Sequence, residues 1–275
     1  MNSPVITPLP ELGVLLVAGP DSRRFLQGQL SNDLDLLDTR AGLRAGLHTP
    51  QGRVLAILQL FPSGEDVLAV TARELIAPVA THLRRYLLRA KARVEEACES
   101  HRVFGLTGAG GRQLLVLPKD MPPPEGPTGE ARDWLAAEIA EGLPQVTAAT
   151  SGQFVAQMLN LDHVEGISFT KGCYTGQEII ARAHYRGRVK RRAQRFEILD
   201  AHDLVPGQKI RLSDGRTADV VNAVKLEDGR QECLAVAALP GGNSEAAGAT
   251  PPQPADDATP VASRPLPLPW PLETV

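Results

Sequence analysis

The stretch Lys171–Glu178, which reads KGCYTGQE, constrains the fold of this chain more than any other segment. It sets a cysteine in a turn flanked by glycines, and glycine adopts backbone conformations that other residues avoid. Thr175 and Glu178 have the spacing of a capping box, which predicts a helix with Thr175 as its N-cap. Gly187 stands where such a helix would end. On this interpretation Cys173 lies just ahead of the N-cap.

Two charges near Cys173 favour its thiolate form. The positive end of the predicted helix dipole and the ammonium of Lys171, two residues away, both stabilise a thiolate. We therefore take Cys173 as the candidate reactive thiol and group with it the other motif residues, Lys171, Tyr174, Gln177 and Glu178. The alternative is an ordinary loop-to-helix junction whose cysteine is a small buried apolar residue. The physical chemistry of the motif alone does not decide between the two.

The composition excludes several classes of protein. The chain has 275 residues and a formal net charge of −3, which gives no sign of a nucleic-acid coat or an anionic membrane partner. Its cysteines, Cys98, Cys173 and Cys233, form no close pair and have no histidine at metal spacing, so we expect no disulfide framework and no local metal site. Such thiols suit a reducing cytosol. With neither a signal peptide nor a transmembrane run evident, we expect a cytoplasmic protein without membrane contact.

The order of apolar runs and turns predicts an α+β chain. Strands are expected in the first part of the chain at residues 13–18, 43–48, 54–61, 67–70, 103–106 and 114–117. Helices are expected after Asp21, with Phe25, Leu26 and Leu30 on one side, and at residues 130–141. Between them, either a helical turn begins at the Thr71–Glu74 capping box and ends at Pro78, or the main helix starts with Pro78 and covers residues 78–90. Residues 147–169 have little regular pattern and lead into the cysteine motif.

After Gly187 the character of the sequence changes. Short strands are expected at residues 194–199, 209–212, 218–224 and 233–238, which predicts a small antiparallel barrel or sandwich. The last part gains Pro, Ala, Gly and Asp and loses its apolar pattern, so we expect it to be disordered. The predicted domains are therefore residues 1–189, residues 190–240 and a tail at residues 241–275.

A run of basic residues surrounds the junction between the two predicted domains. It consists of Arg182, Arg186, Arg188, Lys190, Arg191, Arg192 and Arg195. Such a run is consistent with a contact to RNA or another anion. Its alternative interpretation is a solvated face beside a domain junction, which is the commoner case for a run taken alone.

The motif also resembles the signature of a known family, the YgfZ-type folate-binding proteins, which are relatives of the glycine-cleavage T-protein (aminomethyltransferase). Residues 171–178 match the family pattern K-G-C-Y-x-G-Q-E at every fixed position. Similar segments flank it, at residues 152–154, 157–161 and 181–187, and the opening helix and the Gly52-Arg53 turn also look like those of the family. The resemblance covers about residues 12–240 and strongly favours the reactive-cysteine interpretation.

The resemblance implies a three-lobed cloverleaf, in which two N-terminal α+β lobes and a C-terminal antiparallel β-barrel surround a channel for tetrahydrofolate or a derivative. It also implies an accessory role in assembling or repairing iron–sulfur enzymes, including those that thiolate tRNA. The implied partners are folate and iron–sulfur enzymes or their assembly factors.

Trp134 looks like a tryptophan that lines the folate channel in the family. The further candidate folate contacts are Gln29, Asn32, Arg182, Tyr185 and Arg186. One departure bears on catalysis: in the aminomethyltransferases a carboxylate follows the glycine turn, whereas only apolar side chains stand here near Ala56. Without it, proton transfer beside the pterin lacks a group, which argues against aminomethyl transfer. The alternatives retained are a folate-dependent one-carbon transferase and a non-catalytic RNA-binding module that uses Arg182 to Arg195.

Overall fold

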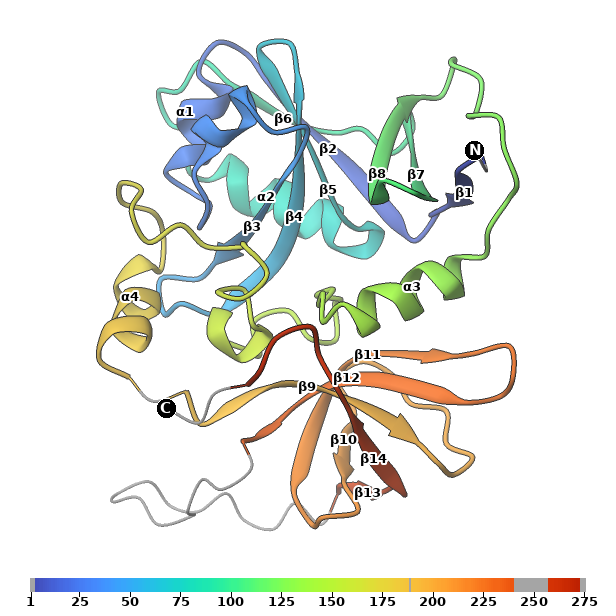
Figure 1. The fold of residues 1–275 in the computed structure, drawn as a ribbon. Helices are drawn as coiled ribbons and strands as arrows, with labels where there is room; N and C mark the ends of the chain where they lie inside the picture. The colour runs from blue at the N-terminus through green and yellow to red at the C-terminus, as the bar shows by residue number, and fades with distance from the viewer. Residues whose placement is uncertain (1–2, 188, 240–256, 273–275) are drawn as a thin grey trace.

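A computed structural model describes residues 3–187, 189–239 and 257–272 of the chain. Its strands form three sheets, and α3 (Ala131–Ala140) lies between the two N-terminal sheets and the C-terminal one (Figure 1). The α+β class predicted from the sequence is confirmed. In the described part of the chain, no helix is both long and apolar enough to cross a membrane.

The largest N-terminal sheet has five antiparallel strands in the order β3-β4-β5-β2-β6. Their bounds are β2 Leu12–Ala18, β3 Leu43–His48, β4 Val54–Ser63, β5 Asp66–Ala72 and β6 Arg93–Glu96. The continuous apolar run of β2 reflects burial on both faces. Leu15 and Val17 enter the main core, while Leu12 and Val14 join a second cluster under the neighbouring sheet.

Two helices accompany this sheet, and both differ in length from the sequence prediction. α1 (Ser22–Gln27) is shorter than expected, and the predicted helical residue Leu30 instead forms a bridge with Leu47 of β3. α2 (Ile76–Arg84) starts before Pro78 and ends six residues earlier than residue 90. Its buried side chains include Val79 and Leu83, which pack in the main core.

The second N-terminal sheet has three antiparallel strands in the order β1-β7-β8. Their bounds are β1 Val5–Pro8, β7 His101–Gly108 and β8 Gly111–Pro118. Trp134 of α3 packs against β7 so closely that a Cβ at Gly105 would lie 2.3 Å from the indole. A glycine at this place in the strand is therefore needed for the helix to dock.

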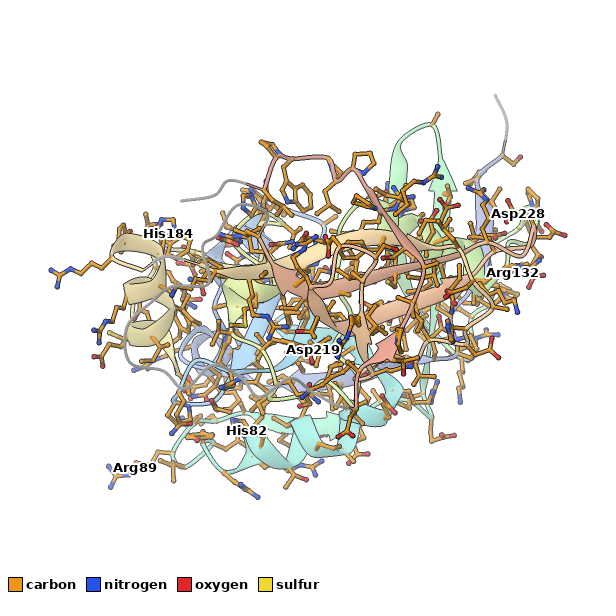
Figure 2. All side chains as sticks on the ribbon, turned by 90° about the horizontal axis from the view of Figure 1, so that it is seen from below. His82, Arg89, Arg132, His184, Asp219 and Asp228 are labelled. Carbon is orange, nitrogen blue, oxygen red and sulfur yellow. The ribbon has the colours of Figure 1, made fainter. Side chains whose placement is uncertain are left out.

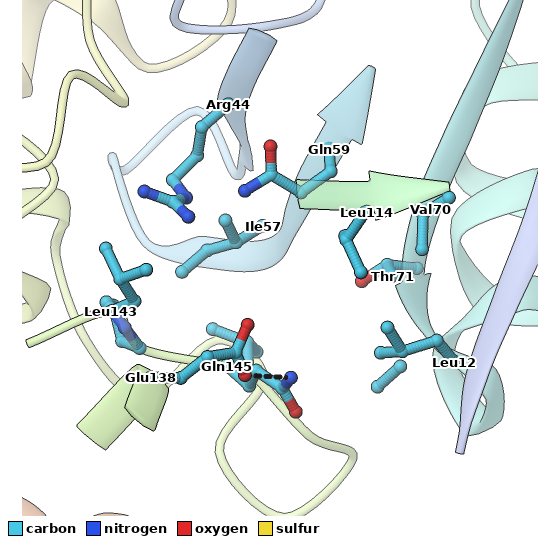
Figure 3. A pocket seen from close by; sticks show the side chains of 13 residues that line it. Leu12, Arg44, Ile57, Gln59, Val70, Thr71, Leu114, Glu138, Leu143 and Gln145 are labelled. Atoms are coloured by element: carbon cyan, nitrogen blue, oxygen red, sulfur yellow. Dashed lines mark hydrogen bonds between the residues drawn. The ribbon is translucent and has the colours of Figure 1, made fainter. Parts of the chain in front are cut away.

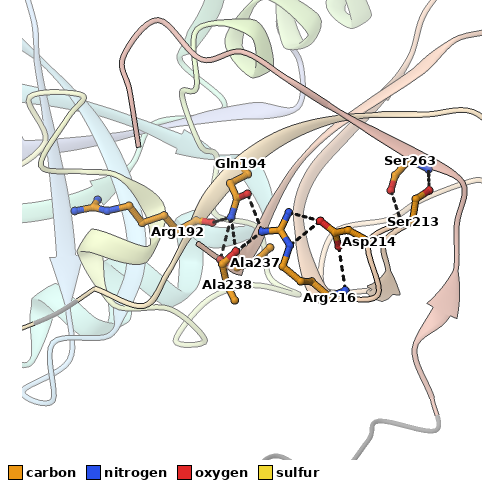
Figure 4. Close-up of polar contacts among 8 residues, drawn as sticks. All are labelled: Arg192, Gln194, Ser213, Asp214, Arg216, Ala237, Ala238 and Ser263. Carbon is orange, nitrogen blue, oxygen red and sulfur yellow. Dashed lines mark hydrogen bonds and ion pairs between the residues drawn. The ribbon is translucent and has the colours of Figure 1, made fainter. Parts of the chain in front are cut away.

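The C-terminal sheet has six strands in the order β13-β10-β11-β12-β9-β14. Their bounds are β9 Arg191–Ile198, β10 Lys209–Arg211, β11 Thr217–Lys225, β12 Gln231–Ala238, β13 Thr259–Pro260 and β14 Ser263–Leu266. β13 and β14 pair with opposite edges of this sheet, and reciprocal backbone-to-hydroxyl hydrogen bonds between Ser213 and Ser263 hold the segment there (Figure 4).

The predicted disorder of the tail at residues 241–275 is therefore wrong for residues 257–272. The proline content misled the prediction, because an edge strand tolerates a residue without an N–H. Pro265 occupies such a position in β14, opposite Phe196 of β9. The rest of the predicted tail, residues 241–256 and 273–275, lies outside the described residues.

Candidate functional site

The cysteine motif leads into α4 (Gln177–Tyr185), which begins one residue later than predicted. Its N-cap is Gly176, with φ of +84°, and no described side chain caps the helix. The predicted capping box of Thr175 and Glu178 is therefore wrong. The cause is close packing on the β3–β4 turn, since a Cβ at Gly176 would lie 2.7 Å from the carbonyl oxygen of Thr49. Only glycine fits both this contact and the left-handed backbone.

Lys171 is a buried residue that connects the motif to the chain after α1. Its Nζ donates to the carbonyl oxygens of Gln27 (2.7 Å), Leu30 (2.8 Å) and Asn32 (2.7 Å). Burial lowers the pKa of Lys171 to about 8, against the opposing effect of Asp33 and Asp35. The sequence interpretation expected the Lys171 ammonium to stabilise the Cys173 thiolate. In the structure the ammonium instead donates its hydrogen bonds to these carbonyl oxygens. The role of Lys171 visible in the structure is thus to fix the loop.

Tyr174 is the second anchor of the motif, and Cys173 beside it is exposed. The Tyr174 ring lies 5.3 Å from the Lys171 ammonium and 6.3 Å from the His48 ring. Burial raises the pKa of Tyr174 to about 12 and lowers that of His48 to about 4, so both are neutral near pH 7. The interpretation of Cys173 as a buried apolar residue is wrong. Gln177 is half-buried in the first turn of α4.

A small polar cavity of about 40 Å³ lies elsewhere, between the N-terminal sheets and the end of α3. Its polar lining comes from Arg44, Gln59, Glu138 and Gln145, and apolar side chains such as Ile57 complete it (Figure 3). A cavity of this size holds a few water molecules. It adjoins a groove of about 590 Å³, and the two share Ala72 and Gln145 in their linings.

Opposite charges face each other across this cavity. Arg44 and Gln59 lie on one side, and Glu138 and Gln145 lie on the other (Figure 3). With its amide oxygen turned toward Arg44, Gln59 accepts from Nη2 (2.7 Å) and Nε (2.9 Å). Gln145 Nε2 donates to Glu138 Oε2 (2.6 Å). No ion pair joins Arg44 to Glu138, both of which are described, so each retains capacity for a further partner.

The electrostatics of the cavity centre on Glu138, which is 8 % exposed. Burial raises the pKa of Glu138 to about 7, while the positive charges of Arg112 and Arg44 oppose the shift. Burial also lowers the pKa of Arg44, and Glu138 opposes that change. The carboxyl group therefore changes its protonation near neutral pH, which suits a group that exchanges hydrogen bonds or protons with a ligand.

The predicted folate contacts do not line this cavity. Trp134 is sealed between Gly105 and the guanidinium of Arg112, which lies 4.5 Å from its ring. The Asn32 amide donates to the carbonyl oxygens of Arg44 and Glu165, at 2.7 Å each, and so has a structural role. The remaining candidates, Gln29, Arg182, Tyr185 and Arg186, are also absent from the linings of the cavity and the groove.

The sequence interpretation missed Arg44, Gln59, Glu138 and Gln145. One signal was available: Glu138 follows Trp134 by four residues on the predicted helix, so it shares the face of the residue expected to be buried. A carboxylate on a buried helix face needs partners or a function. No comparable signal existed for Arg44 or Gln59, whose positions in strands are ordinary.

The three arginines of the predicted basic stretch that lie on β9 are neutralised by ion pairs. Arg192 binds Asp162 through two hydrogen bonds of 2.9 Å, Arg195 binds Glu232 and Arg191 binds Asp219. Figure 4 shows Arg192 directed away from the polar network of Gln194 and Arg216. These three side chains point from β9 toward carboxylates of adjoining segments, so the RNA contact predicted for Arg182 to Arg195 stays a prediction for the residues outside β9. Arg188 lies outside the described residues.

Across residues 3–187, 189–239 and 257–272, no group of three or more His, Cys, Asp or Glu side chains gathers as a metal site requires.

The arrangement of sheets and helices resembles the fold of an aminomethyltransferase of the glycine cleavage system. The crystal structure of aminomethyltransferase T from Bartonella henselae matches with a TM-score of 0.59, covering 86% of this chain and 79% of that one. Because the two sequences are only 12% identical, the likeness concerns the fold.

Sequence relatives define the family more narrowly. Proteins named tRNA-modifying protein YgfZ, from Shigella boydii serotype 4 and Escherichia coli strain SE11, are each 31% identical, over 81% of this chain and 82% of theirs. No protein-family model matches. The chain belongs to the YgfZ family, which confirms the resemblance predicted from the cysteine motif.

Proposed function

We propose that this chain is a tetrahydrofolate-binding protein that serves tRNA modification, with the folate in the polar cavity and its adjoining groove. The relatives are named for tRNA modification, and the fold is that of a folate-related transferase class. Arranged like those transferases, the chain would have three lobes around a central channel, with the C-terminal sheet closed as a barrel. The observation that carries the proposal is that Arg44 and Glu138, both described, line one cavity without an ion pair between them.

The chemistry of a pterin ring fits these residues. Its aminopyrimidinone edge presents adjacent N–H donors, for which Glu138 is an acceptor, and a carbonyl oxygen, for which Arg44 is a donor. When bound, a folate supplies a carrier for one-carbon units. The cavity alone is too small for the ring, but the adjoining groove of about 590 Å³ has the size of ordinary ligand sites. Binding would therefore replace the cavity water and extend into the groove.

Anaerobic calorimetry with tetrahydrofolate tests this proposal. We expect Glu138→Gln to weaken binding by about 10- to 100-fold, since hydrogen bonds to a charged group contribute roughly 1.5–3 kcal/mol. Glu130→Gln is the matched control, because Glu130 is exposed at the start of the same helix. Absence of binding by the wild type, or equal loss in both variants, would contradict the assignment of the cavity.

We further propose that Cys173 is a reactive thiol at the surface and that it contacts iron–sulfur enzymes or their assembly factors. Its exposure supports access by a macromolecular partner. A single thiol does not hold a cluster, since clusters take about four ligands, so the contact would be transient or shared with the partner. Iodoacetamide trapping tests the reactivity: labelling of Cys173 no faster than that of a free cysteine peptide would remove this part.

A second candidate function, folate-dependent one-carbon transfer, is favoured by one observation. Glu138 lines the same cavity as Ile57, the neighbour of Ala56, and so brings a carboxyl group to the cavity beside the strand where the expected one is missing; its pKa of about 7 suits proton transfer at neutral pH. Incubation with methylene-tetrahydrofolate and candidate amines tests it. Turnover no faster than the reaction in buffer removes this candidate and leaves the binding proposal intact.

A further inference from the structure

Three aromatic rings gather at the carboxyl end of α4. The Phe169 ring stacks on the His184 ring, with centroids 3.8 Å apart and planes 16° apart. Tyr185 presents its edge to His184 at 4.8 Å and to Phe169 at 6.2 Å. Tyr185 is nevertheless 67% exposed, and His184 lies at the periphery of the molecule (Figure 2). Phe169 packs against the main core, whereas His184 and Tyr185 are exposed, so the cluster presents an ordered aromatic surface anchored by Phe169.

The charged side chains near these rings along the chain are mainly basic, exposed to solvent and not ion-paired with described residues. Arg182, Arg186 and Lys190 are exposed, and none of the three forms an ion pair with any described residue. They differ in this respect from the paired arginines of β9. Glu178, one turn before Arg182, is the acidic residue on α4 itself. The end of the helix therefore keeps a net positive charge beside the rings.

We propose that this surface, formed by Phe169, Arg182, His184, Tyr185 and Arg186, binds single-stranded RNA, with a base stacking on Tyr185. Aromatic side chains stack with unpaired bases of any sequence, and neighbouring cations follow the phosphates. An acidic protein surface would need the cations but not the ordered rings. The choice of RNA rests on the proposed function in tRNA modification.

The surface adjoins the reactive cysteine along the chain. Phe169 stands two residues before Lys171, and its stacking on His184 holds the start of the cysteine loop against the end of α4. Gly176 holds the other end of the loop at the start of the same helix. RNA bound on the rings would consequently lie along the flank of α4 that carries the Cys173 loop.

Fluorescence anisotropy with a labelled, unstructured RNA of about 12 nucleotides tests the stacking. The full-length protein should bind, and Tyr185→Ala should raise the Kd by about 5- to 100-fold, the range for loss of one stacked base. Tyr86→Ala is the matched control, because Tyr86 is an exposed tyrosine on another part of the surface, 39% exposed. Its Kd should equal that of the wild type.

The salt dependence of the same binding tests the cations. Replacing Arg182 and Arg186 by alanine together should reduce the slope of log Kd against log salt by about 1.4, since each phosphate contact on a single strand contributes about 0.7. Arg89→Ala, which lies apart from His184 in Figure 2, should leave the slope unchanged.

Three results would overturn the inference: no RNA binding by the wild type, equal losses in the controls, or a loss confined to the arginine variants. The last would identify a general anion surface, such as one for an acidic protein. Wild-type protein that binds tetrahydrofolate but not RNA would disprove this inference alone. Protein that binds RNA as described but not tetrahydrofolate would disprove only the folate proposal.

Discussion

Lys171 and Glu138 are both buried and ionisable, but they differ in how fully hydrogen bonds satisfy the charged group. Three backbone carbonyls accept from Lys171 Nζ, which uses all three of its donors. Glu138 interacts with the side chains of Gln145 and Trp134, and burial raises its pKa to about 7. A satisfied charge fixes structure, whereas a charge with unused hydrogen-bonding capacity facing a cavity is available to a ligand.

Replacing Lys171 by Met should therefore destabilise the protein. The variant leaves buried carbonyl oxygens of Gln27, Leu30 and Asn32 without their donor, and each such loss costs about 1–3 kcal/mol. We expect the free energy of unfolding in urea to fall by about 3 kcal/mol or more. Lys190→Met, at an exposed lysine, should change it by less than about 0.5 kcal/mol. Equal effects would show that the carbonyl contacts contribute little.

The raised pKa of Glu138 predicts a pH dependence of stability. Because the folded pKa of about 7 exceeds the ordinary value of 4.5, the folded state binds the proton more tightly. The stabilisation is complete below pH 4.5 and is lost as the pH rises through 7, by about 3 kcal/mol in total. Glu138→Gln should remove this component, measured as the difference between wild type and variant from pH 4.5 to pH 7.5. A constant difference across that range would contradict the shift.

At the scale of elements, the start of α4 depends on the β3–β4 turn rather than on a cap. Gly52 and Gly176 both have positive φ, and their backbones are in contact: a Cβ at Gly176 would lie 3.1 Å from the Gly52 Cα. A Cβ at Gly52 would in turn lie 3.0 Å from Ile179 of α4. Gly52 of the turn and Gly176 of the motif thus allow the helix to dock, and the docked helix fixes one end of the Cys173 loop.

The two flanking glycines of the motif should therefore respond differently to alanine. Gly176→Ala meets both a left-handed backbone and the Thr49 carbonyl, so we expect a loss of about 2–4 kcal/mol in unfolding free energy. A Cβ at Gly172 meets no atom within 4 Å, so Gly172→Ala should stay within about 0.5 kcal/mol. Urea denaturation of both variants measures this. Tolerance of alanine at residue 176 would restore Thr175 as a candidate cap.

These elements also show what the sequence could and could not predict. Apolar runs bounded by turns predicted strands such as β3, at the edge of its sheet, and β11, in the interior of the C-terminal sheet. The Thr175–Glu178 spacing gave a wrong N-cap, because the spacing of residues within the motif carries no information about the backbone contact between Gly176 and residues 49–52. Arg44 and Glu138 stand 94 positions apart in the sequence and meet only through packing of separate segments. The loop that carries Cys173 and the helix after it could be predicted because that motif is local.

At the scale of the whole molecule, residues 257–272 link parts that are far apart in the sequence. β13 and β14 extend opposite edges of the C-terminal sheet, and the following segment reaches the end of α3. There Trp270 packs on Gly142 and stacks parallel to His163, with ring centroids 5.8 Å apart. The segment thus joins the C-terminal sheet to the region that contains the cavity.

Ending the chain after residue 256 should accordingly destabilise the whole molecule. The truncation exposes strand edges of β9 and β10 and removes Val261, which is 5 % exposed, together with Trp270. Burial of one such apolar side chain contributes about 1.5–3 kcal/mol, so we expect a loss of at least about 3 kcal/mol and a decrease in Tm of roughly 6–12 °C. A synthetic peptide of residues 257–272 should restore the Tm when added, whereas a scrambled peptide should not. An unchanged Tm of the truncated protein would mean that residues 257–272 do not contribute to stability. The edge-strand hydrogen bonds of this segment and its buried Val261 argue against that outcome.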